Sequence, residues 1–343
     1  MKTIYLDTNI IGTLKSKSIE NDRIIKLLRT KYQCVVSRET LEEICNSPIE
    51  YHQAHMNVIA ELNTKLIVQL RDPPLFHPSD RYRLDTGDLS LLLPEILAKK
   101  DSYDLSTQLM NTTLHDLVKY HGGSPELNQL EISKIKTSEF SDCMSQLSST
   151  INNLGLDSYQ TDKMQSDIFD MEMSFINSQE ETVRLYTEHE TLYTQNPKSD
   201  FREHIDTIAL QLSNINGPNI IHQICSRLKS LDIYLEKSSE EILGISQNYL
   251  YPGEVLTLSE QIIAIYNMLD SLNYRSDRKL HKEQKLKSFM KDQVHCMYGS
   301  CCDYICAIDV GLRYKAIAIY EYLDMQTEVI SFDELTDMLD ARC

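Results

Sequence analysis

The sequence contains no apolar stretch long enough to span a bilayer, and Met1-Lys2 leads into an expected strand rather than into a signal-peptide core. The 9 cysteines, an odd number, include no CxxC pair, and Cys34 and Cys306 fall within apolar strand patterns. We therefore expect reduced, buried thiols, no zinc site and no membrane partner. A cytoplasmic protein is the expectation that follows.

Positive charge is also scarce, because 34 Lys and Arg face 51 Asp and Glu, for a formal net charge of −17. This balance excludes a surface that holds nucleic acid by bulk attraction, so a nucleic-acid ligand would need a local basic track. With 343 residues, of which 41% are hydrophobic, the chain can bury one large or two ordinary cores. The composition is that of a soluble globular protein.

Asp7 is the first candidate for chemistry. It directly follows the apolar strand pattern of residues 2–6 and precedes an expected helix. An acid at the carboxyl end of a buried strand lies where open α/β sheets bind their ligands. The alternative is that Asp7 merely caps the next helix. Other carboxylates at matching strand ends would favour the ligand-binding interpretation.

Three further acids meet that condition. Glu43 falls in the first turns of a helix capped by Ser37, where Leu41 and Ile44 form the inward stripe. Near the other end of the chain, Asp292 lies in a helical pattern, and Asp309 ends the strand pattern that runs from residue 302. The four carboxylates converge if these strands are neighbours.

These residues resemble the PIN-domain nucleases. The resemblance covers about the first fifth and the last sixth of the chain, and its pieces occur in the order of the family. They are Leu6-Asp7-Thr8-Asn9, Val36-Ser37 with Leu41-x-Glu43-Ile44, Asp292-x-x-His295, Cys302-Asp303-Tyr304-Ile305-Cys306 with Ala307-Ile308-Asp309, Lys315-Ala316 and Thr327-x-Val329. Ala307 departs from the family, which most often has Thr or Ser there.

The resemblance implies a parallel sheet flanked by helices, and it implies that Asp7, Glu43, Asp292 and Asp309 are catalytic metal ligands. Clustered carboxylates suit Mg²⁺ or Mn²⁺, which can lower the pKa of a bound water and orient it toward a phosphodiester. Asn9 would orient Asp7 or a bound water. No Ser or Cys nucleophile is needed.

The sequence gives two alternative roles to each of two neighbouring residues. Asp303 opens the strand that ends at Asp309 and is expected to be a structural cap or to support the ligands. His295 follows Asp292 by three residues and so shares its helix face. It is either a satisfied interior histidine or a residue that supports the ligands or contacts phosphate.

A basic segment precedes Asp292. It is either an ordinary solvated face or a track for a nucleic-acid backbone, and two residues beyond Asp309 could extend it or pair with the carboxylates. The candidate nucleic-acid-binding residues are Arg278, Lys282, Lys285, Lys287, Lys291, Arg313 and Lys315.

Glu43 and Asp292 are 249 positions apart, and this long separation indicates an insertion. We expect a discontinuous catalytic domain of residues 1–50 and 275–343 and an all-helical bundle of residues 51–274. Residues 140, 144, 147, 151 and 154 form a heptad seam, which predicts a long helix packed on another. The bundle would pack as a core, gate the substrate, or bind a regulatory protein or a second copy.

The sequence therefore predicts an α/β protein that acts as a metal-dependent nuclease. RNA is favoured over DNA only by the family resemblance, and a toxin or defence role is an association alone. The alternatives are a scaffold or partner-binding protein with a vestigial catalytic domain, and a phosphatase or a DNA or flap nuclease that uses the same metal chemistry.

Overall fold

The structure is a computed structural model that describes residues 1–72, 77–85, 87, 89–92, 94, 96, 129–153, 157–188, 212, 214–230, 235–248, 255–276 and 283–341. The chain forms two compact units. The first, here called the sheet unit, comprises Met1–Ala98, Ile205–Arg278 and Ser288–Cys343. The second, the hairpin unit, comprises Lys99–His204 and Lys279–Lys287.

A six-stranded sheet organises the sheet unit. Its strands are β1 (Lys2–Leu6), β2 (Tyr32–Val36), β3 (Lys65–Asp72), β4 (His77–Asp85), β5 (Tyr304–Cys306) and β6 (Glu328–Ile330). The order is β4-β3-β2-β1-β5-β6, and all neighbours are parallel except the antiparallel pair β3 and β4. The predicted α/β class with a mainly parallel sheet is confirmed.

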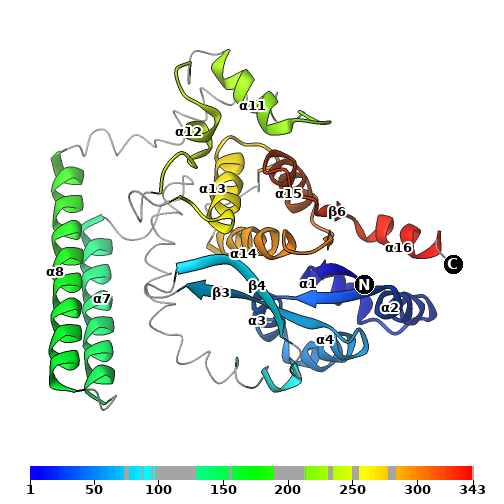
Figure 1. The fold of residues 1–343 in the computed structure, drawn as a ribbon, viewed down its shortest axis with the longest axis horizontal. Coiled ribbons are helices and arrows are strands. Elements are labelled where there is room, and N and C mark those ends of the chain that lie inside the picture. The colour runs from blue at the N-terminus through cyan, green and yellow to red at the C-terminus, as the bar shows by residue number, and fades with distance from the viewer. Residues whose placement is uncertain are drawn as a thin grey trace. The chain divides into compact units, whose positions relative to one another are not determined.

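Strand β1 lies where the strand order reverses. The chain proceeds from β1 outward through β2 to β4, then returns to place β5 on the other side of β1 (Figure 1). Leu6 is paired with Cys306, and the amide of Asp7 donates to the Cys306 carbonyl at 3.1 Å. Ligands of open α/β sheets bind outside the carboxyl ends of the strands at such a switch point.

One face of the sheet carries a core shared with several helices. Among the described residues these are the short helix that contains Leu89 and the α-helices α1 (Thr8–Leu14), α2 (Ile19–Lys31), α3 (Arg38–Asn46), α4 (Ile49–Glu61) and α16 (Phe332–Asp340). Ile4 and Leu6 of β1 belong to this core, as do Cys34 and Val36 of β2. Because side chains alternate along a strand, Tyr5 points to the opposite face.

Helix α14 (Glu283–Gly299) packs on that opposite face, where the Tyr5 hydroxyl bonds to His295. Helix α13 (Leu258–Ser271) contacts both β4 and α15 (Val310–Tyr322), and α15 contacts α11 (Ile220–Lys229). The short helices η1 (Leu89–Leu91) and α12 (Ser239–Leu243) complete the described elements of this unit. Helices therefore cover both faces of the sheet (Figure 1).

The expectation that residues 51–274 are wholly helical is wrong. Strands β3 and β4 lie within that range and continue the sheet beyond β2, because Val35 and Val36 pair with Lys65 and Leu66. Helices α11 and α13 also belong to the sheet unit, through their packing on α15. The bounds of the compact units thus differ from the predicted division at residues 50 and 275.

In the hairpin unit, α7 (Gln129–Asn152) packs along α8 (Ser158–Glu188). Met144 and Ile151 of the predicted seam are buried with Ile168, and Phe140 stacks on Phe175 with ring centroids 4.0 Å apart. The predicted long packed helix is confirmed, but Leu147 of the predicted seam is exposed, and position 154 lies outside the described residues. None of the helices in the described ranges is long and apolar enough to cross a membrane.

Candidate metal centre

Asp7 follows β1 and is 3% exposed. It occupies the N-cap position of α1, yet its side chain makes no capping hydrogen bond. Instead, the Asn9 side-chain amide donates to Asp7 Oδ2 at 3.1 Å, which confirms the contact predicted for Asn9. Burial raises the pKa of Asp7, although the charge of His295 opposes this shift. A buried carboxylate that does not cap its helix is available to a ligand.

Glu43 reaches the same place from α3. The helix begins after Ser37, whose hydroxyl accepts from the Thr40 amide, and its inward stripe includes Leu41 and Ile44 as predicted. The Thr8 hydroxyl donates to Glu43 Oε2, and Lys291 Nζ lies 3.5 Å from Oε1. These contacts give Glu43 a fixed position beside the end of β1.

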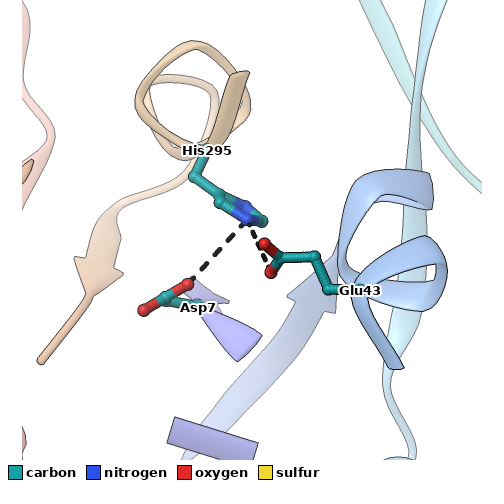
Figure 2. Close-up of side chains that lie close together, drawn as sticks. All are labelled: Asp7, Glu43 and His295. Carbon is teal, nitrogen blue, oxygen red and sulfur yellow. Dashed lines mark hydrogen bonds and ion pairs between the residues drawn. The ribbon is translucent and has the colours of Figure 1, made fainter. Parts of the chain in front are cut away.

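His295 connects the two acids. Its Nε2 lies 3.2 Å from Glu43 Oε2 and 3.9 Å from Asp7 Oδ1, and Figure 2 shows the imidazole directed at both carboxylates. Its Nδ1 lies 2.7 Å from the Tyr5 hydroxyl, on the other side of the ring. The histidine is 1% exposed and its ring contacts both carboxylates, so we count it as a member of the cluster.

The charges of the cluster are strongly coupled. Burial alone would raise the pKa of Glu43, but the hydrogen bonds from His295 and Thr8 and the charges of His295 and Lys291 lower it to about 2. Burial likewise disfavours protonated His295, but Glu43, Asp7 and Asp292 overcome this effect and raise the pKa of the imidazole. The cluster therefore favours positive charge between Asp7 and Glu43.

The three side chains fit a divalent cation. One ligand atom from each of Asp7, Glu43 and His295 lies within 4.8 Å of the others. Each residue also has a partner outside this group that fixes its orientation, since Asn9, Thr8 and Tyr5 bond to the three side chains in that order. Such supporting hydrogen bonds are typical of metal ligands.

The other two predicted ligands lie outside this group of described residues. Asp309 caps α15, where its Oδ1 accepts from the Leu312 amide at 2.7 Å. Asp292 is partly exposed on α14, one turn before His295, and its charge contributes to the raised pKa of that histidine. The structure thus brings together two of the four acids and adds His295. Metal ligation by Asp292 and Asp309 stays a prediction.

Asp303 has a structural role at the opposite end of β1. Its Oδ2 accepts from the backbone amide of Thr3 at 2.7 Å and from the Thr3 hydroxyl at 2.8 Å. These bonds join the start of β5 to β1 at the amino end of the strand, whereas the cluster lies at the carboxyl end. The expectation that Asp303 supports the ligands is therefore wrong, and the cap alternative is closer to what is observed.

The predicted basic track is only partly available. Lys315 is fully buried and its Nζ lies 3.1 Å from Asp270 Oδ1, so its assignment to nucleic-acid binding is wrong. Arg313 lies 3.9 Å from Glu334, and Lys291 faces Glu43. Lys285 and Lys287 are exposed on α14, whereas Arg278 and Lys282 lie outside the described residues.

Sequence reasoning placed His295 among interior or supporting residues and did not identify Tyr5. The available signal was the position of His295 three residues after Asp292, which places it on the same helix face. Comparisons of the chain with protein-family models, curated proteins and solved structures found no match.

Proposed function

We propose that this protein is a divalent-metal-dependent phosphodiesterase of the PIN type, most specifically an endoribonuclease. The convergence of Asp7, Glu43 and His295 beside the switch point of the sheet carries the proposal. Two carboxylates and an imidazole around one position are a donor set for a divalent cation. Phosphodiester hydrolysis is a reaction class that uses such a cation.

The geometry of the cluster disfavours His295 as a general base for a side-chain nucleophile and Cys306 as that nucleophile. His295 Nε2 faces two carboxylates, whereas a general base for a hydroxyl or thiol nucleophile would face that group. The nearby thiol of Cys306 is fully buried, and burial raises its pKa, so it remains protonated. Water is thus the nucleophile that the site favours.

Each residue has a role in this proposal. A divalent cation at the site would lower the pKa of a coordinated water and neutralise charge that develops on the phosphate. Asp7 and Glu43 hold the cation, and Asn9 and Thr8 orient these carboxylates. Lys291 is partly exposed and lies beside Glu43. In this proposal it contacts a phosphate oxygen of the substrate. Asp292 and Asp309 belong to the site only by the family resemblance.

One observation favours the scaffold alternative. Asp309 is engaged in capping α15, and the ion pair of His295 with Glu43 satisfies both side chains without a cation. A protein that had lost its activity could retain this pair for stability, with the α7–α8 hairpin as its binding element. The same experiment separates the two functions.

The experiment incubates purified full-length protein with labelled single-stranded RNA, structured RNA, and single-stranded and flap DNA, with Mg²⁺, Mn²⁺ or EDTA. The test variants are Asp7→Asn and Glu43→Gln. The matched control is Glu42→Gln, because Glu42 adjoins Glu43 on α3 but pairs with Arg38 at 2.8 Å. We expect RNA cleavage that requires metal, is reduced at least about 100-fold in both test variants, and is unchanged in the control.

Each outcome decides between functions. Cleavage that survives Asp7→Asn and Glu43→Gln would place the activity elsewhere. Cleavage of DNA in preference to RNA would support the DNA or flap nuclease alternative. Absence of cleavage from a folded protein that binds metal would favour the scaffold.

A further inference from the structure

We infer that His295 is itself a metal ligand, so that the site selects a first-row transition ion such as Mn²⁺ over Mg²⁺. This inference rests on the metal site of the proposed function. It deepens that function by assigning the class of cation, because the nitrogen ligand distinguishes this site from the all-carboxylate site that the family resemblance implies.

The distances from Nε2 to the two acids are those expected between ligands of one cation. Atoms that each lie about 2.1 Å from one ion are about 3 to 4 Å apart. The imidazole Nε2 lies 3.2 Å from Glu43 and 3.9 Å from Asp7, and all three ligand atoms lie within 4.8 Å. A cation between the carboxylates would therefore meet the ring nitrogen.

The Tyr5 hydroxyl directs Nε2 toward the cluster. It lies 2.7 Å from Nδ1 of His295 and 2.8 Å from the Ser37 hydroxyl. When Nδ1–H donates to Tyr5 and Tyr5 donates to Ser37, Nε2 carries the lone pair and faces the carboxylates. Metal-binding histidines are oriented by such a bond from their other ring nitrogen.

Burial prevents the imidazole from leaving the site. His295 and Tyr5 are both buried, with ring centroids 5.9 Å apart, and Asp7 is buried beside them. Lone pairs of Nε2 and two carboxylates would repel one another unless a proton or a cation lies among them, and a cation can take the place of the proton that otherwise joins Nε2 to Glu43. Imidazole is a good ligand for first-row transition ions, whereas Mg²⁺ prefers oxygen and keeps several waters. A site with one nitrogen and two carboxylate ligands should therefore bind a first-row transition ion more tightly than Mg²⁺.

The test measures Mn²⁺ binding to the full-length protein by electron paramagnetic resonance, with Mg²⁺ as competitor. We expect one bound Mn²⁺ per chain and at least roughly tenfold weaker binding of Mg²⁺. The electron spin echo of bound Mn²⁺ should show coupling to a directly ligated nitrogen, and ¹⁵N-histidine labelling should change that signal.

His295→Asn is the informative variant, because the Asn amide can replace Nδ1 toward Tyr5 but offers no atom at the place of Nε2. It should abolish the nitrogen coupling and most of the preference for Mn²⁺. His222→Asn, at an exposed histidine of α11, is the matched control and should change neither. If His295→Asn does not fold, the labelled unmodified protein still gives the decisive signal.

The outcomes separate this inference from the proposed function. Mn²⁺ that is bound, is released by Asp7→Asn and shows no nitrogen coupling would overturn the histidine ligand but leave the carboxylate site intact. Nitrogen coupling in a protein that cleaves no substrate would support the ligand and count against the nuclease. Absence of Mn²⁺ binding would overturn both the ligand and the proposed metal dependence.

Discussion

Asp7 and Asp309 occupy equivalent local positions but do different things. Each follows a strand and begins a helix, at the N-caps of α1 and α15. Asp309 accepts the capping hydrogen bond from Leu312, whereas Asp7 makes none. A capping bond contributes about 1 kcal/mol to the stability of a helix, and the Asp7 side chain does not provide this bond to α1. Its carboxylate is held instead by Asn9 in the direction of Glu43 and His295, which is consistent with selection for a site.

The ion pair of Glu43 and His295 predicts how stability depends on pH in the metal-free protein. The pKa of Glu43 is lowered from 4.5 to about 2, so its contribution is present above pH 4.5 and is lost as the pH falls toward 2. The pKa of His295 is raised from 6.5, so its contribution is complete below pH 6.5 and is lost as the pH rises through the folded-state value. The pair therefore stabilises most between pH 4.5 and 6.5.

Glu43→Gln should reveal this window. In EDTA, the variant should lose about 1–3 kcal/mol of unfolding free energy within the window, and the loss should shrink as the pH rises above it. Urea unfolding followed by circular dichroism across the pH range measures the difference. Glu42→Gln should give a curve parallel to that of the unmodified protein. A loss for Glu43→Gln that grows at alkaline pH would contradict the assigned ion pair.

At the scale of elements, a buried ion pair joins α15 to α13. Lys315 and Asp270 are both fully buried, and their charged atoms lie 3.1 Å apart. The Lys315 ammonium also lies over the rings of Tyr266 and Phe289, at 4.6 and 5.0 Å from their centroids. Helix α14, which carries Phe289 and His295, is thus packed against the helices that this pair connects. The pair supports the position of the histidine rather than contacting nucleic acid.

Lys315→Met should be strongly destabilising, because the Asp270 carboxylate would lose its buried cationic partner. We expect a loss of about 3–5 kcal/mol in unfolding free energy. The double variant Lys315→Met with Asp270→Leu should recover much of that loss, since it removes both charges. Urea unfolding of Lys315→Met, Asp270→Leu and the double variant forms a mutant cycle. If the stability lost by the double variant equals the sum of the losses of the two single variants, the two residues are not coupled as the structure indicates.

The elements that the sequence predicted are those with local signals. Strands β1 and β5 follow from apolar runs that end on acids, and α3 follows from Ser37 and its apolar stripe. Strands β3 and β4 were missed, although Leu66, Ile67 and Val68 form a strand-like run, because the whole of residues 51–274 was assigned to a helical bundle. Their pairing depends on neighbours far along the chain.

The site was predictable only where an acid lies in a locally recognisable element. Asp7 directly follows β1, Glu43 lies in the helix that Ser37 caps, and these two acids do converge. The histidine could not be assigned, because helix spacing gives the face of His295 but not the direction of Nε2, which depends on Tyr5 290 residues away. The nucleic-acid-binding role predicted for Lys315 was wrong for the same reason, because its partner Asp270 lies on another helix.

At the scale of the whole molecule, the cluster is assembled from both ends of the chain. Asp7 and Glu43 come from the first strands and helices, and His295 comes from α14, which leads into β5. Their contacts require β5 to pair with β1, so no local segment can form the site. By contrast, the α7–α8 hairpin has a small core of its own in Met144, Ile151 and Ile168. Metal binding at the proposed site should therefore change the stability of the sheet unit, whereas the stability of the α7–α8 hairpin need not change.

Metal binding should stabilise the segments that contribute ligands. At a Mn²⁺ concentration about 100 times the Kd, binding adds about 2.7 kcal/mol to the folded state, equivalent to a rise in Tm of about 5–10 °C for a domain of this size. Calorimetry should show this rise, and hydrogen exchange should slow in β1, α3 and α14 together while α7 and α8 remain unchanged. Asp7→Asn should remove both effects. Protection confined to α3 would mean that Glu43 binds the ion without its distant partners, and equal protection of α7 and α8 would indicate a general effect of the cation. Joint protection of β1 and α14 would instead show that one ion connects the two ends of the chain.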